Sequence, residues 1–536
     1  MKQKVLVLLA VVLTVCIALT GCANLNFPGY FAHLSYLLGG GGLTPFDQMT
    51  YTRPDMTAFA AKAEQCCAAA EKETDLEKMV QIIYDLYGAY DDFYTNYAMA
   101  MICYSKDQTD ASWESEYNFC TGNAAQVSAA MDRFYRILAK SPLRKQLEAD
   151  QYFGRDFFAE YEGETIYDAY FTELLDAEAE LENQYYSLIA QAGEDYGYTQ
   201  SFYDAYGSQM AQIFVELIRN RQAQAEHAGY DNYPEFAYGF YHMRDYTPAQ
   251  AVAYLADIRA ELVPLYKTLL QDPGVTLYTS NQSQTFAYVQ SMAQAMGGEI
   301  SQAFLDMEKA GLYDISASEN KLNASFEIYL RNYRSPYVFL NASGTQRDHL
   351  TFAHEFGHFC SDYMSFGSGA GVDVSEVFSQ GMEYLSLCYG PADENLQKLK
   401  MFDSLCIFVE QAAYASFEHQ VYGLEGENLT VDRVQALFDS VCDGYGLEGD
   451  WRYVFITHLF TEPMYVISYT VSNDAALQLY QMEMAKAGSG LACLRENMTT
   501  RQGYFLAFLK EAGLQSPFTP GRITQVKETL QSVLNG

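Results

Sequence analysis

The chain has 536 residues, of which 49% are hydrophobic and 19% are charged, and its formal net charge is −35. This is the composition of a folded globular protein with ample core material. So acidic a chain has no basic footprint for nucleic acid, and we expect no nucleic-acid partner. There are only 13 prolines, against many residues that favour helices, so the composition favours a mainly α-helical class.

The first residues have the pattern of a secretion signal. Lys2 and Lys4 precede the apolar run 5–19, and small residues lead up to Cys22. The ending "LTGC" resembles the bacterial lipobox, in which the cysteine receives a diacylglycerol and becomes the new N-terminus; an ordinary signal or a short membrane anchor are the alternatives. We predict a lipoprotein signal peptide over 1–21 and a lipid anchor on Cys22, which would hold the protein on the extracytoplasmic side of a bacterial cell membrane.

A lipidated tether is expected over 22–45, with a flexible joint at the glycine run 39–42. After Pro54-Asp55 the chain follows a nearly continuous helical pattern to about residue 330. One helix is predicted to begin with Thr247 as N-cap and Pro248 at its first position.

The 11 cysteines are scattered and contain no C-x-x-C pair, so no cysteine zinc site is indicated. Most of those beyond the signal sequence lie in apolar helical contexts. Buried thiols are therefore expected rather than a disulfide framework.

The hydrophobic period changes in the segment "SFEIYLRNYRSPYVFLNASGT" (325–345). Its two short β-branched and aromatic runs, 326–330 and 337–340, predict a small β-ribbon in an otherwise helical protein. The ribbon lies immediately ahead of the motif HEFGH.

HEFGH places His354 and His358 four residues apart, on one face of a helix, so both imidazoles can point at one metal ion. Neutral imidazole suits Zn²⁺, and a catalytic zinc takes three protein ligands plus a water. Glu355 can reach that water and act as general base. The motif predicts one zinc ion per chain.

The surroundings of the motif support a site. If the histidines were ordinary core residues, Glu355 would be buried on an apolar helix without a partner. Gly357 costs about 1 kcal/mol relative to alanine inside a helix, so we expect another backbone or a substrate to approach it closely. Asp348 or Thr345 is available as the helix cap.

The third ligand is expected on the next predicted helix. Glu376 and Glu383 are seven residues apart there and share one face. Glu376 is the preferred ligand and Asp373 its competitor. Glu383 or Asp348 is expected to accept a hydrogen bond from a ligand histidine.

Two stretches resemble the thimet oligopeptidase and oligoendopeptidase F family of zinc peptidases. The first is "PYVFLNASGTQRDHLTFAHEFGH" with the following "SEVFSQGMEYL". The second is "THLFTEPMYVISYTVSNDAALQLY", in which His458, Pro463, Tyr465 and Tyr469 stand in matching places. The segment "NKLNASFEIYL" departs from the family, whose members often have a glycine-rich stretch there.

The resemblance implies that His354, His358 and Glu376 bind zinc and that Glu355 activates water. It further implies that a group of three residues would stabilise the oxyanion of the tetrahedral intermediate: His458, Tyr465 and Tyr469. A phenol near a developing negative charge has a physical rationale of its own.

The β-ribbon would bind the substrate backbone. By the resemblance, its edge strand 337–341 would add a strand of substrate, and Gly344 would allow that backbone to come close.

The resemblance implies a mainly α zincin body with a deep substrate channel, built from an N-terminal helical region over 46–200 and a zinc metallopeptidase catalytic region over 201–536. The expected activity is a zinc-dependent endopeptidase acting on short unfolded peptides. Two alternatives are a zinc aminopeptidase and a peptide-binding lipoprotein with an inactive site. Zinc aminopeptidases carry a G-x-M-E-N motif ahead of the metal helix, and this sequence has none there. The intact Glu355 argues against an inactive binding protein, because binding alone needs no general base.

Overall fold

The computed structural model describes residues 43–149, 152–153, 157–163, 165–189, 200–271, 273–367, 370–447, 452–500 and 502–534. The predicted signal peptide, Cys22 and the glycine joint lie outside these residues. The described chain is mainly α-helical, as predicted, with one small sheet. None of its helices has the length and apolar character needed to span a membrane.

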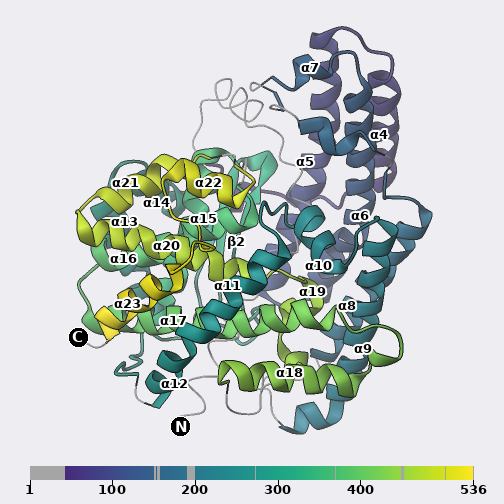
Figure 1. Cartoon of the computed structure of the whole chain (residues 1–536). Helices are drawn as coiled ribbons and strands as arrows, with labels where there is room; N and C mark the ends of the chain where they lie inside the picture. The colour runs from purple at the N-terminus through teal and green to yellow at the C-terminus, as the bar shows by residue number, and fades with distance from the viewer. Residues whose placement is uncertain are drawn as a thin grey trace.

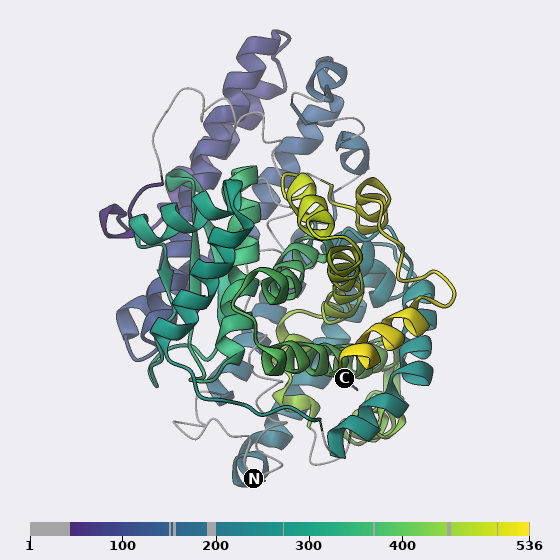
Figure 2. The same cartoon turned by 90° about the vertical axis from the view of Figure 1, so that its left-hand side faces the viewer.

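The N-terminal helices form a layer with its own core. They are η1 (Phe46–Gln48), α4 (Met56–Ala70), α5 (Leu76–Lys106), α6 (Ala111–Lys140), α7 (Arg144–Leu147) and η2 (Phe157–Tyr161). Asp55, Asp75 and Asp110 cap α4, α5 and α6 by accepting backbone N–H groups. The apolar faces of the helices from α4 to η2 share a hydrophobic cluster that extends from Phe59 to Tyr161, whereas Phe46 of η1 packs against the larger cluster of the later helices. Part of this layer rises above the rest of the molecule in both views (Figures 1 and 2).

All later helices bury their apolar faces in a second, larger cluster. Those ahead of the sheet are α8 (Ala169–Ile189), α9 (Gln200–His227), α10 (Tyr233–Phe236), η4 (Ala237–Tyr241), α11 (Pro248–Glu261), α12 (Val263–Gln271), α13 (Gln282–Met296) and α14 (Gly298–Ala310). The predicted start of α11 is confirmed: Thr247 caps it and forms a capping box with Gln250.

The sheet has the strand order β1-β3-β2. Strands β2 (Ser325–Leu330) and β3 (Ser335–Leu340) form the predicted ribbon, paired antiparallel from Ser325↔Leu340 to Leu330↔Ser335. The two-residue strand β1 (Tyr313–Asp314) pairs with β3 in parallel on its other side. β3 is therefore the central strand, and the prediction that 337–341 is the edge strand is wrong; the longer edge strand is β2.

The helices after the sheet carry the candidate site. They are α15 (Arg347–Ser365), α16 (Val372–Tyr389), α17 (Glu394–Val421), α18 (Val431–Tyr445), α19 (Thr457–Thr461), α20 (Ile467–Ala485), α21 (Ser489–Asn497), α22 (Phe505–Ala512) and α23 (Arg522–Leu534), with short turns at η5 (Arg331–Tyr333), η6 (Gly426–Asn428) and η7 (Tyr453–Phe455). α16 packs between α15 and α20, and α15 also packs against β2 and β3. The β2–β3 ribbon, the pair α15 and α16, and the later helix α20 are thus packed together.

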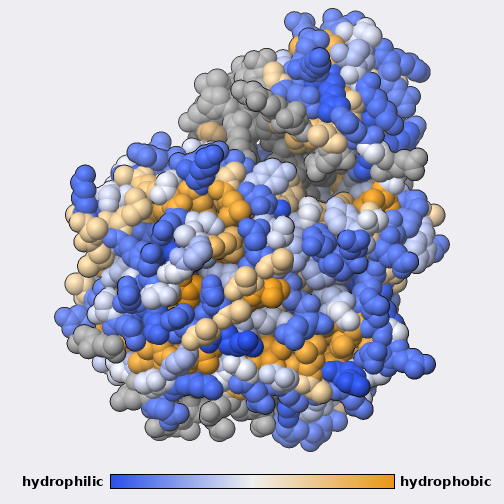
Figure 3. Space-filling view, viewed as in Figure 1, coloured by the Kyte–Doolittle hydropathy of each residue, from blue (hydrophilic) through white to orange (hydrophobic). Residues whose placement is uncertain are grey.

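The surface is mainly hydrophilic on the face in view, and the described cysteines are free thiols, as the composition and the cysteine spacing predict. Figure 3 shows hydrophilic residues over most of the face in view, with apolar residues in smaller patches. The nine cysteines within the described residues are all free, and most are buried. This confirms the expectation of buried thiols for that part of the chain.

At Gly357, α15 packs directly against the backbone of α16. A Cβ added there would lie 2.7 Å from Ser379 Cα and 2.8 Å from the Phe378 carbonyl oxygen. The close backbone expected from the sequence is therefore that of α16. Glycine lowers the helix propensity at this position, but it allows α15 and α16, which both carry site residues, to pack closely.

Gly357→Ala is expected to destabilise the fold by about 1–3 kcal/mol, because overpacking of this contact outweighs the better helix propensity of alanine. The thermal unfolding midpoint measures the effect. Gly122→Ala, in α6, is the matched control, since an added Cβ meets no atom within 4 Å there. Equal midpoints for Gly357→Ala and the parent would contradict this account of the packing.

Candidate metal and catalytic site

The two histidines of HEFGH lie on the buried face of α15. His354 and His358 are one helical turn apart, with ring centroids 5.0 Å from each other. α15 begins after Gln346, which makes no side-chain cap bond, so the expectation that Asp348 or Thr345 caps it is wrong. Asp348 instead accepts the backbone N–H groups of Ser343, Gly344 and Thr345 and so fixes the turn ahead of the helix.

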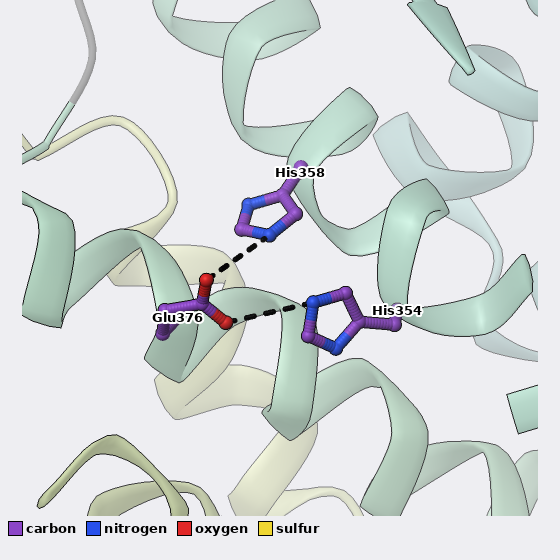
Figure 4. Close-up of side chains that lie close together, drawn as sticks. All are labelled: His354, His358 and Glu376. Carbon is purple, nitrogen blue, oxygen red and sulfur yellow. Dashed lines mark ion pairs between the residues drawn. The ribbon is translucent and has the colours of Figure 1, made fainter. Parts of the chain in front are cut away.

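Glu376 completes a group of three possible metal ligands with the histidines. One ligand atom from each of the three residues lies within 4.8 Å of the others. Nε2 of His354 is 3.5 Å from Glu376 Oε2, and Nε2 of His358 is 4.0 Å from Glu376 Oε1. Figure 4 shows both rings and the carboxylate pointing toward one another from α15 and α16.

The outer nitrogens of both histidines are held by α16. His354 Nδ1 lies 2.8 Å from Glu383 Oε1, and Lys400 donates to the other oxygen of Glu383 at 2.7 Å. His358 Nδ1 lies 3.0 Å from Ser375 Oγ. Of the two carboxylates expected to hold a ligand histidine, Glu383 does so. In a neutral imidazole that donates its Nδ1 hydrogen outward, the lone pair is on Nε2, which faces Glu376 in both residues.

The protonation tendencies of the two histidines differ. Burial lowers the pKa of His358 well below its ordinary value, and the charge of His354 adds to this. For His354, burial acts to lower the pKa, but the hydrogen bond to Glu383 and the nearby carboxylates raise it to about 9. His358 Nε2 is buried and has no hydrogen-bond partner. An orphaned imidazole nitrogen facing a second imidazole and a carboxylate fits a divalent metal ion such as Zn²⁺.

Asp373, the competitor for third ligand, is used elsewhere. Its carboxylate accepts hydrogen bonds from Tyr246 at 2.8 Å, from Arg244 at 3.3 Å and from Ser468. Glu376 lies one turn further along α16, toward the histidines. The structure therefore brings Glu376, and not Asp373, to the group of possible ligands.

Glu355 lies beside this group on the same helix. Its side chain is buried, Ser325 at the start of β2 forms a hydrogen bond with it, and its Oε2 has no hydrogen-bond partner. Burial raises the pKa of Glu355 to about 7, against the opposing effects of His354 and Ser325. A carboxyl with a free oxygen and a pKa near neutrality is suited to accept a proton.

The residues of the second family-like stretch come together around Glu376. The Tyr465 hydroxyl donates to Glu376 Oε1 at 2.8 Å, and the Tyr469 hydroxyl lies 3.2 Å from His458 Nε2. The His458 ring is stacked on Tyr465 at 5.7 Å. Burial lowers the pKa of His458 to about 4, so its ring is neutral. Tyr465 is thus in direct contact with the ligand group, and Tyr469 lies behind it, with its ring 5.1 Å from that of Tyr465.

Gly344 lies in the turn between β3 and α15, with φ of +75°. Its N–H donates to Asp348 at 2.9 Å, and its carbonyl accepts from the N–H of Ser280 at 2.9 Å. Both of its backbone polar groups therefore have partners within the chain. A role for Gly344 in substrate binding stays a prediction.

Several site residues were missed from the sequence. Ser375, Ser325, Lys400 and Arg244 support the ligands or their neighbours through hydrogen bonds. Ser375 adjoins Glu376, but serines carry no pattern that marks such a role. The other three come from distant stretches, so only the folded structure could identify them.

Comparison with known proteins finds a family match in the N-terminal part of the chain. Residues 46–165 match the family described as the Peptidase M3 N-terminal domain. No curated protein sequence matches the chain.

Solved structures share the fold over almost the whole chain. PZ peptidase A with inhibitor 2 superposes with a TM-score of 0.81 at 21% identity, covering 91% of this chain and 99% of that one. A putative oligoendopeptidase F from Bacillus anthracis gives 0.79 at 21% identity, covering 92% and 99%. An M32 carboxypeptidase from Deinococcus radiodurans gives 0.58 at 14% identity, covering 89% and 100%.

The chain thus has the fold of solved helical peptidases and carries a buried group of three possible metal ligands. The N-terminal match is to an M3 peptidase family and the whole described chain has the fold of oligoendopeptidase F structures, in agreement with the resemblance drawn from the sequence.

Proposed function

We propose that the protein is a zinc-dependent endopeptidase that hydrolyses internal bonds of short unfolded peptides outside the cytoplasm. The single observation that carries the proposal is the buried group of His354, His358 and Glu376 with Glu355 beside it. The orphaned Nε2 of His358 supports a bound metal ion. Two of the solved structures with this fold are putative oligoendopeptidases F, which supports an endopeptidase over an aminopeptidase.

Each side chain has a chemical task in this proposal. When bound, zinc would polarise the scissile carbonyl and lower the pKa of water in the site. Glu355 takes the proton of the attacking water and passes it to the leaving amine. Tyr465 and Tyr469 donate hydrogen bonds to the oxyanion that develops on the carbonyl oxygen. Glu383 and Ser375 keep the ligand imidazoles in the tautomer that leaves Nε2 free.

The test is a digest of a mixed peptide library by the purified protein, with and without a chelator, together with metal analysis. We expect about one zinc per chain, cleavage at internal bonds, loss of cleavage on chelation and recovery when zinc is added back. Release of single N-terminal residues would favour the aminopeptidase alternative. Zinc-free protein that retains intact peptides would favour the binding lipoprotein.

The membrane anchor is part of the proposal and rests on the sequence of residues 1–22. Cys22→Ala is expected to remove the acceptor thiol, so the protein stays unprocessed and unlipidated. Mass spectrometry of the N-terminal peptide from membrane fractions measures this. An acylated, processed product from Cys22→Ala would contradict the anchor.

A further inference from the structure

A buried arginine outside the ligand group connects the three segments that carry Glu376, Tyr465 and Tyr469. Arg244 lies between the π-helical turn η4 and α11, and its side chain is 1% exposed. Its Nε donates to Asp373 of α16 at 3.3 Å and its Nη1 to the carbonyl oxygen of Met464 at 2.8 Å. Its Nη2 donates to Ser468 of α20 at 2.7 Å. Each nitrogen of the guanidinium thus binds a different segment.

The Met464 contact falls on the loop between α19 and α20. Met464 has φ of +64°, a left-handed conformation that costs a non-glycine residue roughly 1–2 kcal/mol. Such a residue keeps this conformation only where its surroundings hold it. Tyr465, whose hydroxyl contacts Glu376, is the next residue. The position of its phenol therefore depends on what holds Met464.

Two other side chains bind this loop at and just before the strained residue. The Met464 N–H donates to Glu418 Oε1 at 2.5 Å, and the Pro463 carbonyl lies 3.0 Å from His242 Nε2. Arg244 alone among them also contacts α16, through Asp373, which is one turn before Glu376. Tyr246 donates to the same carboxylate at 2.8 Å. Arg244 thereby fixes the loop relative to the helix of the third ligand.

The chemistry of arginine suits this task. A guanidinium is planar and always charged, and it presents its donors in a fixed fork, so three bonds define both a position and an orientation. The guanidinium is also packed on the Tyr238 ring, with 4.4 Å between its Cζ and the ring centroid. A buried ion pair by itself adds little net stability compared with an apolar packing of the same volume. The contribution of Arg244 is therefore to fix the position of the loop relative to α16, more than to stabilise the fold.

We propose that Arg244 is a positioning residue, which sets the Tyr465 phenol against the Glu376 helix so that it donates to the oxyanion. The proposal rests on the proposed peptidase function and deepens it. Arg244 touches no reacting atom and acts through Tyr465.

The test compares Arg244→Lys with Arg522→Lys in the parent and in Tyr465→Phe. Arg522 is the matched control, because it is a buried arginine that binds Asp474 of the same helix α20 and does not contact the loop. We expect Arg244→Lys to lower kcat about 10–100-fold with a small change in KM and with zinc retained. In the Tyr465→Phe background, Arg244→Lys should lower kcat by less than about threefold, because the hydroxyl that Arg244 positions is already absent.

Equal losses from Arg244→Lys in both backgrounds would overturn the proposal, and so would a parent-like kcat for Arg244→Lys. If Arg244→Lys fails to fold, Ser468→Ala removes one acceptor of the guanidinium and should show the same non-additive pattern. Fluorine NMR of protein labelled with 3-fluorotyrosine gives a readout that needs no activity. The Tyr465 resonance should shift or broaden in Arg244→Lys and stay in place in Arg522→Lys, so failure of the positioning role is distinguishable from absence of peptidase activity.

Discussion

Glu355→Gln is expected to keep the fold and the zinc while lowering peptide turnover by about 10²–10⁴-fold, the usual contribution of a general base. The change preserves shape and removes only the ability to accept a proton. Glu355 Oε2 has no hydrogen-bond partner among the described residues, so the amide breaks no bond there at that atom. Steady-state kinetics on one cleaved peptide, with metal analysis of the same sample, measures both parts of the expectation.

The variant is also expected to fold at least as stably as the parent without metal. Burial raises the pKa of Glu355 to about 7, above the unfolded value. A carboxyl with a raised folded-state pKa stabilises the fold below its unfolded pKa and loses that contribution as the pH rises to the folded pKa. At pH 8 the charged Glu355 is therefore a cost that glutamine avoids.

Glu410→Gln is the matched control for this prediction. Glu410 is buried in α17, burial raises its pKa to about 8, and Tyr266 donates to it at 3.0 Å. It lies away from the ligand group, so the same substitution should leave turnover near the parent rate. Hydrolysis by Glu355→Gln at close to the parent rate would exclude Glu355 as the base.

The local parts of the site could be predicted from the sequence because their geometry is periodic. Positions four apart in a helix face the same way, so HEFGH alone placed His354 and His358 together. The Thr247-Pro248 helix start and the two strands of the ribbon were likewise contained in a few consecutive residues. Such features depend on neighbours in the chain, which a single sequence displays.

The non-local parts could not be predicted by the same reasoning. β3 became a central strand because the two residues of β1 pair with it, and two residues carry no strand pattern. Asp373 competes with the preferred Glu376 in the sequence, and what excludes it is the binding of its carboxylate by Arg244 and Tyr246, which lie more than 120 positions earlier. Periodicity gives no information on which distant side chain will satisfy a buried charge. For His458, Tyr465 and Tyr469, the family resemblance supplied what periodicity could not.

Tyr465→Phe is expected to lower kcat about 10²–10³-fold, equivalent to roughly 3–4 kcal/mol, with a much smaller change in KM. The phenol donates to Glu376 in the structure and lies where it can donate to an oxyanion that exists only in the transition state. Phenylalanine keeps the ring contacts with His458 and Tyr469 and removes only the hydroxyl. Kinetics, zinc content and thermal unfolding of the same preparation separate effects on catalysis, on metal binding and on stability.

Tyr469→Phe is expected to have the smaller effect, since its hydroxyl contacts His458 and not the ligand group. Tyr254→Phe is the control for a structural tyrosine. The Tyr254 hydroxyl is buried and donates to the Thr470 carbonyl oxygen of α20 at 3.0 Å, so its removal should lower stability and leave kcat nearly unchanged. A Tyr465→Phe protein that behaves like Tyr254→Phe would mean that Tyr465 is structural. Because the positioning role of Arg244 acts through the same phenol, that result would remove both assignments while leaving the base and the ligands in place.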